Sequence, residues 1–207
     1  MKLPRFNEDS YAHFITTNTF GCKSIFKNSD CRQILLKNID FYRNKLDFKL
    51  MGYVIMPDHF HAIIWWDADK HQDLNISRIT RSIKSHTARE IINLNTGSRG
   101  PLTSAENICL GQAFGSEAAQ ARRGTQTTRK KYPHRRISEQ KYRLWQPSFY
   151  DFNIYSEEKL RQKLNYIHLN PVRGGLVNKP EDYPYSSYRS YYLNDEKILK
   201  IDRLFNI

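Results

Sequence analysis

The pattern of apolar and polar positions predicts that strands and helices alternate along the first half of the chain. Residues 10–20 are rich in β-branched and aromatic side chains and are typical of a strand. Asn28 then offers a cap for a helix over residues 31–46. The apolar positions of that helix recur at helical spacing and predict one buried stripe: Leu35, Ile39, Tyr42 and Leu46.

A hairpin and a second helix are predicted next. Residues 47–56 and 59–66 are apolar and β-prone, and Pro57 with Asp58 between them favours a turn. The helix is expected over residues 74–94, with one apolar side and one basic side. Its apolar side comprises Ile76, Ile79, Ile83, Thr87 and Ile91.

The character of the chain changes over residues 95–143. Five of the nine glycines lie between residues 97 and 124. Residues 122–143 carry nine Lys and Arg against one Glu, a net charge of +8. Such a long stretch without apolar periodicity is typical of a flexible insertion rather than of the packed fold.

The pattern resumes with a strand and a helix. Residues 144–154 are predicted as a strand, in which Pro147 favours an edge or a bulge. Ser156 begins a third helix, which Asn170 and Pro171 are expected to end. The order strand, helix, strand, strand, helix, strand predicts an α+β, ferredoxin-like sandwich with a central antiparallel sheet. We expect a single domain over residues 1–207, with residues 172–207 as a C-terminal tail that wraps it.

The amino-acid composition limits the classes of molecule that the protein is expected to bind. The formal net charge is +12 and the pI is near 9.6, which favours a polyanion such as a nucleic acid. The longest apolar run has five residues, far below the ~20 that a membrane helix needs, and no signal peptide is apparent. Three cysteines without metal spacing are typical of a reduced compartment, so we expect a cytoplasmic protein with no membrane partner.

Two histidines are the first candidates for chemistry. His59 and His61 flank Phe60 in a predicted strand, so alternation sends both imidazoles to one face, where they can reach the same divalent cation. Two nearby histidines on a strand are also common as surface or packing residues. Asp58 either orients one of them or serves only the turn.

The third helix carries the second pair of candidates. Tyr166 and Asn170 are four residues apart and therefore share one face. If that face meets the histidines, a hydroxyl and an amide oxygen join the site. His168, on the same helix, is expected to be exposed.

Four runs together resemble a known family: residues 53–61 (YVIMPDHFH), 145–151 (WQPSFYD), 166–173 (YIHLNPVR) and 182–188 (DYPYSSY). They are similar to the single-tyrosine HUH transposases of the IS200-like insertion-sequence superfamily, above all to the REP-associated tyrosine transposases. The resemblance covers about residues 10–94 and 144–192. The insertion has no counterpart in the family pattern.

The resemblance implies a role for each candidate. His59 and His61 match ligands of Mg²⁺ or Mn²⁺ on a central strand, and Asn170 matches a polar third ligand, which is Gln in some relatives. Tyr166, on a C-terminal helix, matches the nucleophile that attacks single-stranded DNA and forms a 5′-phosphotyrosine. The implied substrate is single-stranded DNA with imperfect hairpins, either REP-like or at the ends of an element. We expect a monomer, although some relatives exchange tyrosine helices across a dimer.

Basic residues are candidates for DNA binding. One set lies on the second predicted helix: Arg78, Arg81, Lys84 and Arg89. The other lies in the insertion: Arg129, Lys130, Lys131, Arg135 and Arg136. The alternative for the helix set is a solvated basic face, and the alternative for the insertion set is a disordered solubilising loop.

Two other classes of function stay open. One is a domesticated nucleic-acid-binding protein that does not cleave, and the other is a zinc hydrolase. No HExxH motif supports the hydrolase. The joint presence of two histidines, a tyrosine and an amide favours the enzyme.

Overall fold

The computed structural model describes residues 11–95 and 143–203, so nearly all of the predicted insertion lies outside the described residues. The elements are β1 (Ala12–Asn18), η1 (Phe20–Cys22), η2 (Ile25–Lys27), α1 (Ser29–Leu46), β2 (Lys49–Ile55), β3 (His59–Trp65), α2 (Ile76–Asn95), β4 (Tyr150–Ile154), α4 (Glu157–Arg173), η5 (Pro180–Asp182) and α5 (Tyr188–Tyr192). Within this described part, no helix combines the length and the apolar character that crossing a membrane requires.

The strands form one antiparallel sheet in the order β2-β3-β1-β4. This order, together with the succession β1, α1, β2, β3, α2, β4, is that of a ferredoxin-like fold, and the predicted fold class is confirmed. β3 and β1 are the inner strands. The edges are β2 and β4.

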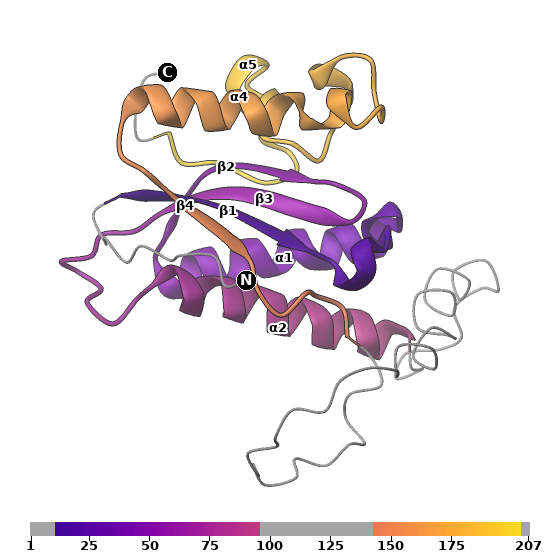
Figure 1. Ribbon diagram of the computed structural model, residues 1–207, viewed down its shortest axis with the longest axis horizontal. Helices are drawn as coiled ribbons and strands as arrows, with labels where there is room; N and C mark the ends of the chain where they lie inside the picture. The colour runs from indigo at the N-terminus through magenta and orange to yellow at the C-terminus, as the bar shows by residue number, and fades with distance from the viewer. Residues whose placement is uncertain (1–10, 96–142, 204–207) are drawn as a thin grey trace, which may run out of the picture.

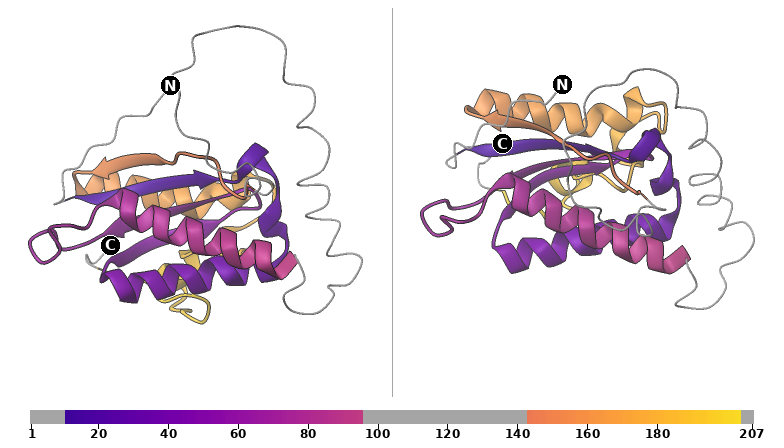
Figure 2. Two further views of the ribbon diagram at one scale, coloured as in Figure 1. Left: turned by 90° about the horizontal axis from the view of Figure 1, so that it is seen from below. Right: turned by 60° about the horizontal axis from the view of Figure 1, so that its bottom comes forward.

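Helices cover both faces of the sheet, as Figures 1 and 2 show. α1 and α2 lie against one face, and α4 with the C-terminal segment lies against the other. β3 is buried on both sides because its alternate residues enter different cores. Phe60 and Ile64 join the core beneath α1 and α2, whereas Ile63 joins the core beneath α4. The sheet is therefore the middle of three layers.

The first two helices follow the predicted pattern. Asn28 caps α1, and its Oδ1 accepts hydrogen bonds from the backbone N–H groups of Asp30 at 2.7 Å and Cys31 at 3.1 Å. Leu35, Ile39 and Tyr42 are buried, and Leu46 packs against the same core. The predicted apolar side of α2 is buried at all five positions, Ile76, Ile79, Ile83, Thr87 and Ile91.

Two predicted boundaries are wrong. The strand expected over residues 144–154 is regular only from Tyr150, because Pro147 has no N–H to donate and the chain is irregular before it. α4 continues through Pro171 to Arg173 instead of ending at Asn170. A proline in the last turn removes only one backbone bond, and the N–H of Gly174 still reaches the Asn170 carbonyl at 2.8 Å.

The C-terminal segment covers the β2 edge of the sheet. The N–H of Ile55 donates to the carbonyl of Tyr185, and that of Ser187 donates to the carbonyl of Tyr53, both at 2.9 Å. Further along, the N–H of Asp202 donates to the carbonyl of Leu50 at 2.8 Å. These bonds satisfy an edge that would otherwise invite pairing with another chain.

Candidate active site

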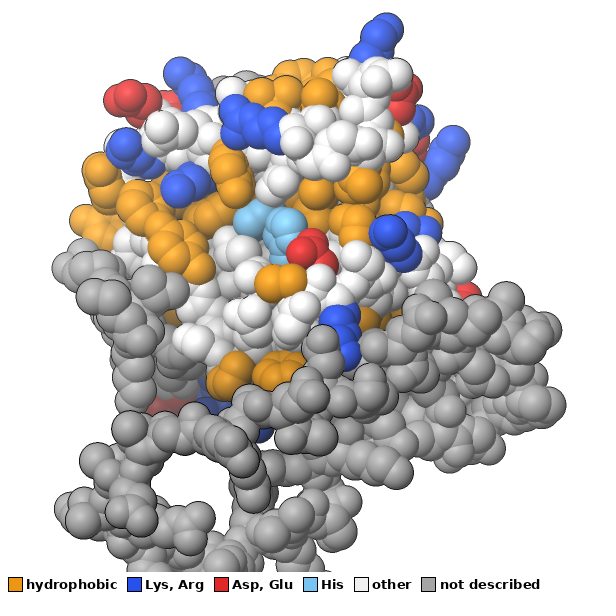
Figure 3. All heavy atoms as spheres, turned by 45° about the vertical axis from the view of Figure 1, so that its right-hand side comes forward, with side chains coloured by type: hydrophobic (Ala, Val, Ile, Leu, Met, Phe, Trp, Pro, Cys, Tyr) orange, Lys and Arg blue, Asp and Glu red, His pale blue; other side chains and the backbone are white. Residues whose placement is uncertain are grey.

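The two histidines lie where β3 begins, directly after the turn at Pro57 and Asp58. Their side chains point to the α4 face, with ring centroids 4.8 Å apart and nearly perpendicular planes. His61 is 3% exposed and His59 is half-buried. At this end of the molecule, histidine side chains reach the surface among hydrophobic ones (Figure 3).

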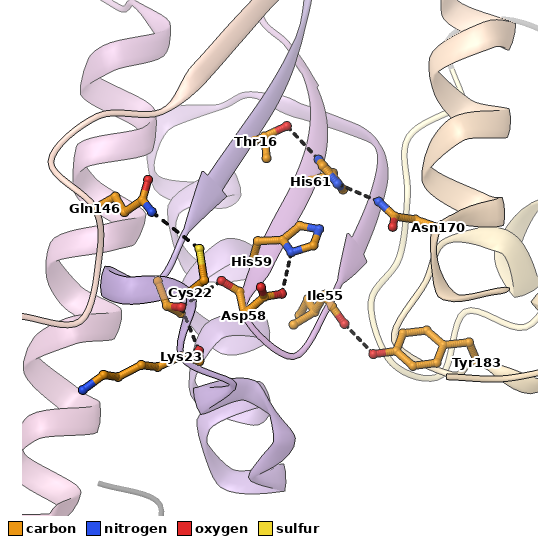
Figure 4. Close-up of polar contacts among 11 residues, drawn as sticks. Thr16, Cys22, Lys23, Ile55, Asp58, His59, His61, Gln146, Asn170 and Tyr183 are labelled. Atoms are coloured by element: carbon orange, nitrogen blue, oxygen red, sulfur yellow. Dashed lines mark hydrogen bonds and ion pairs between the residues drawn. The ribbon is translucent and has the colours of Figure 1, made fainter. Parts of the chain in front are cut away.

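Each imidazole is oriented through its Nδ1 atom, as Figure 4 shows. His59 Nδ1 donates to Asp58 Oδ1 at 2.7 Å, and His61 Nδ1 lies 2.7 Å from Thr16 Oγ1. Asp58 therefore contacts a histidine in addition to its place in the turn. Such contacts to the far nitrogen fix the tautomer and leave Nε2 for a ligand.

α4 brings Asn170 and Tyr166 to the same place. Asn170 Nδ2 donates to His61 Nε2 at 2.7 Å. The Tyr166 ring stands 5.3 Å from the His61 ring, and its side chain is 41% exposed. The structure thus gathers His59, His61, Tyr166 and Asn170 within one chain.

Burial controls the charge of this site. Desolvation, and to a smaller extent electrostatic interaction with His59 and Lys163, lower the pKa of His61 to about 3. The ring is therefore neutral near pH 7, which is the form that binds a metal ion. Its Nε2 lone pair already faces a polar side chain, so the hydrogen bond to Asn170 occupies the position that a cation would take.

The donor set fits a divalent cation. The described residues contain no group of three or more His, Cys, Asp or Glu side chains that would bind a metal by themselves. A cation here would be held by Nε2 of His59, Nε2 of His61 and the amide oxygen of Asn170. Oxygen donors suit Mg²⁺ and Mn²⁺, whereas imidazole suits transition metals, so Mn²⁺ matches the mixed set better than Mg²⁺ does.

Three side chains at the site are absent from the sequence-based candidates. Thr16 reaches His61 only because β1 and β3 place these two residues opposite each other. Lys163 and Arg173 project from α4, and helical spacing from Tyr166 and Asn170 provides a signal for both. The Arg173 guanidinium carbon is 5.8 Å from the Tyr166 ring centroid.

The predicted DNA-binding residues of α2 are not at this site. Arg78, Arg81 and Arg89 are exposed on α2, which packs against the opposite face of the sheet (Figure 1). Lys84 is half-buried, and its Nζ donates to the backbone carbonyls of Gln146 at 2.9 Å and Ser148 at 3.1 Å. Lys84 therefore anchors the segment that leads into β4. The insertion set lies outside the described residues: Arg129, Lys130, Lys131, Arg135 and Arg136.

The expectation for His168 is wrong. Its side chain is buried, and its Nε2 lies 3.0 Å from Ser187 Oγ. Tyr188, Tyr191 and Tyr192 surround the ring. Burial lowers the pKa of His168 to about 4. The C-terminal segment covers this side of α4, which helical spacing alone does not reveal.

The N-terminal half of the chain is similar in sequence to a known protein family. Residues 7–100 match the family described as transposase IS200 like. Two curated relatives match over shorter stretches. The chain is 42% identical over 52 residues to a putative REP-associated tyrosine transposase of Haemophilus influenzae, which is 24% of this chain and 30% of the relative. It is 36% identical over 45 residues to the REP-associated tyrosine transposase of Escherichia coli K12, which is 22% of this chain and 27% of the relative.

A solved structure matches the whole chain. The REP-associated tyrosine transposase bound to a REP hairpin superposes with a TM-score of 0.63, covering 100% of this chain and 92% of that one, at 18% identity. The aligned stretches span less than a third of either curated relative, whereas the structural match extends across both described segments. Residues 7–100 are therefore similar in sequence to the IS200-like transposases, and the chain shares its fold with the solved REP-associated tyrosine transposase.

Proposed function

We propose that this protein is a metal-dependent transposase that nicks and rejoins single-stranded DNA beside hairpins, with Tyr166 as its nucleophile. The observation that carries the proposal is the contact of Asn170 with Nε2 of His61, next to the ring of Tyr166. It brings a nucleophile and a three-donor cation site together from β3 and α4. The names of the relatives support it, because they are REP-associated tyrosine transposases and the solved one holds a REP hairpin.

The reaction requires a phosphodiester to reach Tyr166. A bound Mg²⁺ or Mn²⁺ would polarise the scissile phosphate and offset the negative charge that develops on it. The Tyr166 oxygen forms a bond to phosphorus, and the bond from phosphorus to the 3′ oxygen breaks. The products are a 5′-phosphotyrosine and a free 3′ hydroxyl, with the phenol proton passing through solvent to the departing oxygen. The new ester keeps the energy of the phosphodiester, so a 3′ hydroxyl can reverse the step without ATP.

The chain prepares this geometry before DNA binds. Asp58 and Thr16 hold the two imidazoles so that both Nε2 atoms face the site. Tyr166 is exposed enough to meet a strand from solvent, while its ring packs edge-on against His61. All four residues come from one chain, which supports a monomer as the active unit.

A covalent adduct is the direct test. Labelled single-stranded hairpins from the flanks of the gene would be incubated with the protein and Mn²⁺ or Mg²⁺. We expect an adduct that survives denaturation, with mass spectrometry placing the DNA on the peptide that contains Tyr166. Tyr166→Phe should form none, because it lacks the attacking oxygen. The matched controls Tyr150→Phe and Tyr155→Phe should form it. A full-strength adduct in Tyr166→Phe would refute the assignment.

The histidines have a separate test. His59→Ala and His61→Ala should abolish cleavage but leave hairpin affinity mostly intact, since affinity for DNA comes largely from contacts to the phosphate backbone. Normal cleavage by both variants would make the histidines structural. If the wild type binds cognate hairpins but never forms an adduct, the protein is a non-cleaving binder instead.

The basic insertion is proposed to add contacts to the DNA backbone. Neutralising its five candidate residues should reduce the dependence of the binding constant on salt by roughly 0.7 in the log–log slope for each lost phosphate contact on a single strand. The substituted positions are Arg129, Lys130, Lys131, Arg135 and Arg136. An unchanged slope would assign binding to other surfaces.

A further inference from the structure

Aromatic side chains continue outward from the site along the edge strand β4. Tyr150 lies opposite Thr16 of β1, which in turn lies opposite His61 of β3. Residues that face one another in this way point to the same side of a sheet, so Tyr150 lies on the α4 face, about 10 Å from His61 at two strand spacings. Its side chain is 37% exposed.

The rings form a connected surface. The buried Phe14 packs edge-on against Tyr166, with centroids 5.9 Å apart, and against Tyr150 at 6.2 Å. Phe152, opposite Phe14, packs against Tyr155 at 6.3 Å. Tyr155 is 60% exposed. Phe14 and Phe152 thus support two exposed rings that begin beside the nucleophile and extend away from it.

The ammonium group of a lysine side chain lies beside the same rings. Lys163 Nζ lies 4.7 Å from the Phe14 ring centroid and 4.4 Å from that of Phe152. The ion pairs formed by the described residues do not include Lys163, so its charge is not neutralised by a carboxylate of that part of the chain. Around the histidines, hydrophobic and basic side chains share the surface with an acidic one that lies against the imidazoles (Figure 3).

We propose that Tyr150 and Tyr155, with Lys163, bind unpaired bases of the strand that Tyr166 attacks. The rings stack on the bases, and the ammonium contacts the backbone between them. The inference rests on the proposed function for the position of the scissile phosphate.

Single-stranded DNA fits this surface better than a protein partner does. A row of exposed rings with a lysine ammonium beside it matches the requirements of an unpaired, negatively charged strand, because every base has a face that stacks on an aromatic ring. Tyr150 and the nucleophile also pack on the same buried ring, Phe14, and Tyr150 lies on the only sheet edge of the described residues that the C-terminal segment leaves open. A strand held here would enter the site at a fixed register.

The test measures affinity apart from cleavage. In the Tyr166→Phe background, short unstructured oligonucleotides would be titrated by fluorescence anisotropy at fixed salt. Tyr150→Ala and Tyr155→Ala should each weaken binding about tenfold, which is 1.4 kcal/mol and within the range for one stacked base. Tyr150→Phe and Tyr155→Phe should bind normally. Phe41→Ala is the matched control, because Phe41 is 52% exposed, lies beneath a lysine and belongs to α1 on the opposite face. It should have no effect.

An abasic nucleotide separates stacking from damage to the fold. Suppose that an abasic nucleotide at one position weakens DNA binding by the parent protein, Tyr166→Phe, but causes no further loss of affinity in the Tyr150→Ala variant. The Tyr150 ring then stacks on the base at that position. Equal losses in both proteins at every position would overturn the proposal, as would a changed oligomeric state with unchanged DNA binding. Weaker binding by the alanine variants without any adduct in the wild type would overturn only the proposed cleavage.

Discussion

Gly52→Ala should destabilise the protein, because the Leu164 side chain of α4 lies against this glycine of β2 and leaves no room for a Cβ. A Cβ built on Gly52 would lie 2.6 Å from Leu164 Cδ2, whereas carbon atoms in contact prefer about 3.5–4.0 Å. Leu164 is buried in the core beneath α4, so it has little room to withdraw. We expect a cost of about 1–3 kcal/mol, which is typical of overpacking.

If the clash with Leu164 is the cause, the loss of stability in Gly52→Ala should depend on the Leu164 side chain. Leu164→Ala alone should cost about 2–5 kcal/mol because it leaves a cavity. In that background Gly52→Ala should be neutral, or stabilise by up to about 1 kcal/mol, since the clash is gone and alanine restricts the unfolded chain. The two substitutions should therefore show a coupling energy of at least about 1 kcal/mol.

Urea unfolding of the four proteins, followed by circular dichroism, measures this cycle. The control pairs Gly52→Ala with Leu35→Ala, which removes a buried leucine from the core on the opposite face of the sheet. Those two effects should add to within about 0.5 kcal/mol. An equal cost of Gly52→Ala with and without the Leu164 side chain would refute the close approach of α4. Loss of adduct formation should accompany the clash, because α4 carries Tyr166.

Three more outcomes are expected. Asp58→Ala should lower cleavage about 10- to 100-fold and raise the metal concentration for half-maximal cleavage, because it frees the His59 ring; unchanged metal dependence would leave Asp58 as a turn residue only. Asp151→Ala should cost roughly 3–5 kcal/mol in urea unfolding, since it strands the buried His13, and Asp151→Ala with His13→Leu should cost less than this. Tyr183→Phe should cost about 0.5–1.5 kcal/mol at pH 7 by removing a 2.6 Å hydrogen bond to a β2 carbonyl. Burial raises the pKa of Tyr183 to about 12, above its unfolded value near 10, so its contribution is present below pH 10 and lost between pH 10 and 12; alkaline unfolding of the variant should be less steep in this window.

The sequence alone determined the elements whose signals are local. The Asn28 cap, the turn at Pro57 and the five apolar positions of α2 depend on residues close together in the chain, so spacing and side-chain type were sufficient to predict them. Strand alternation likewise placed His59 and His61 on one face, and helical spacing paired Tyr166 with Asn170. The order of elements then favoured one fold.

Only the tertiary structure decided which faces meet. Thr16 reaches His61 through the register of β1 against β3, and Asn170 reaches it because α4 packs across the sheet from α1 and α2. The same packing buries His168, which lies on a helix position that local spacing left exposed. Contacts of this kind join residues far apart in sequence, and their free energy comes from surfaces that exist only once several elements have packed. For that reason the sequence pattern predicted which side chains belong to the site, whereas the tertiary structure determined which side chains they contact.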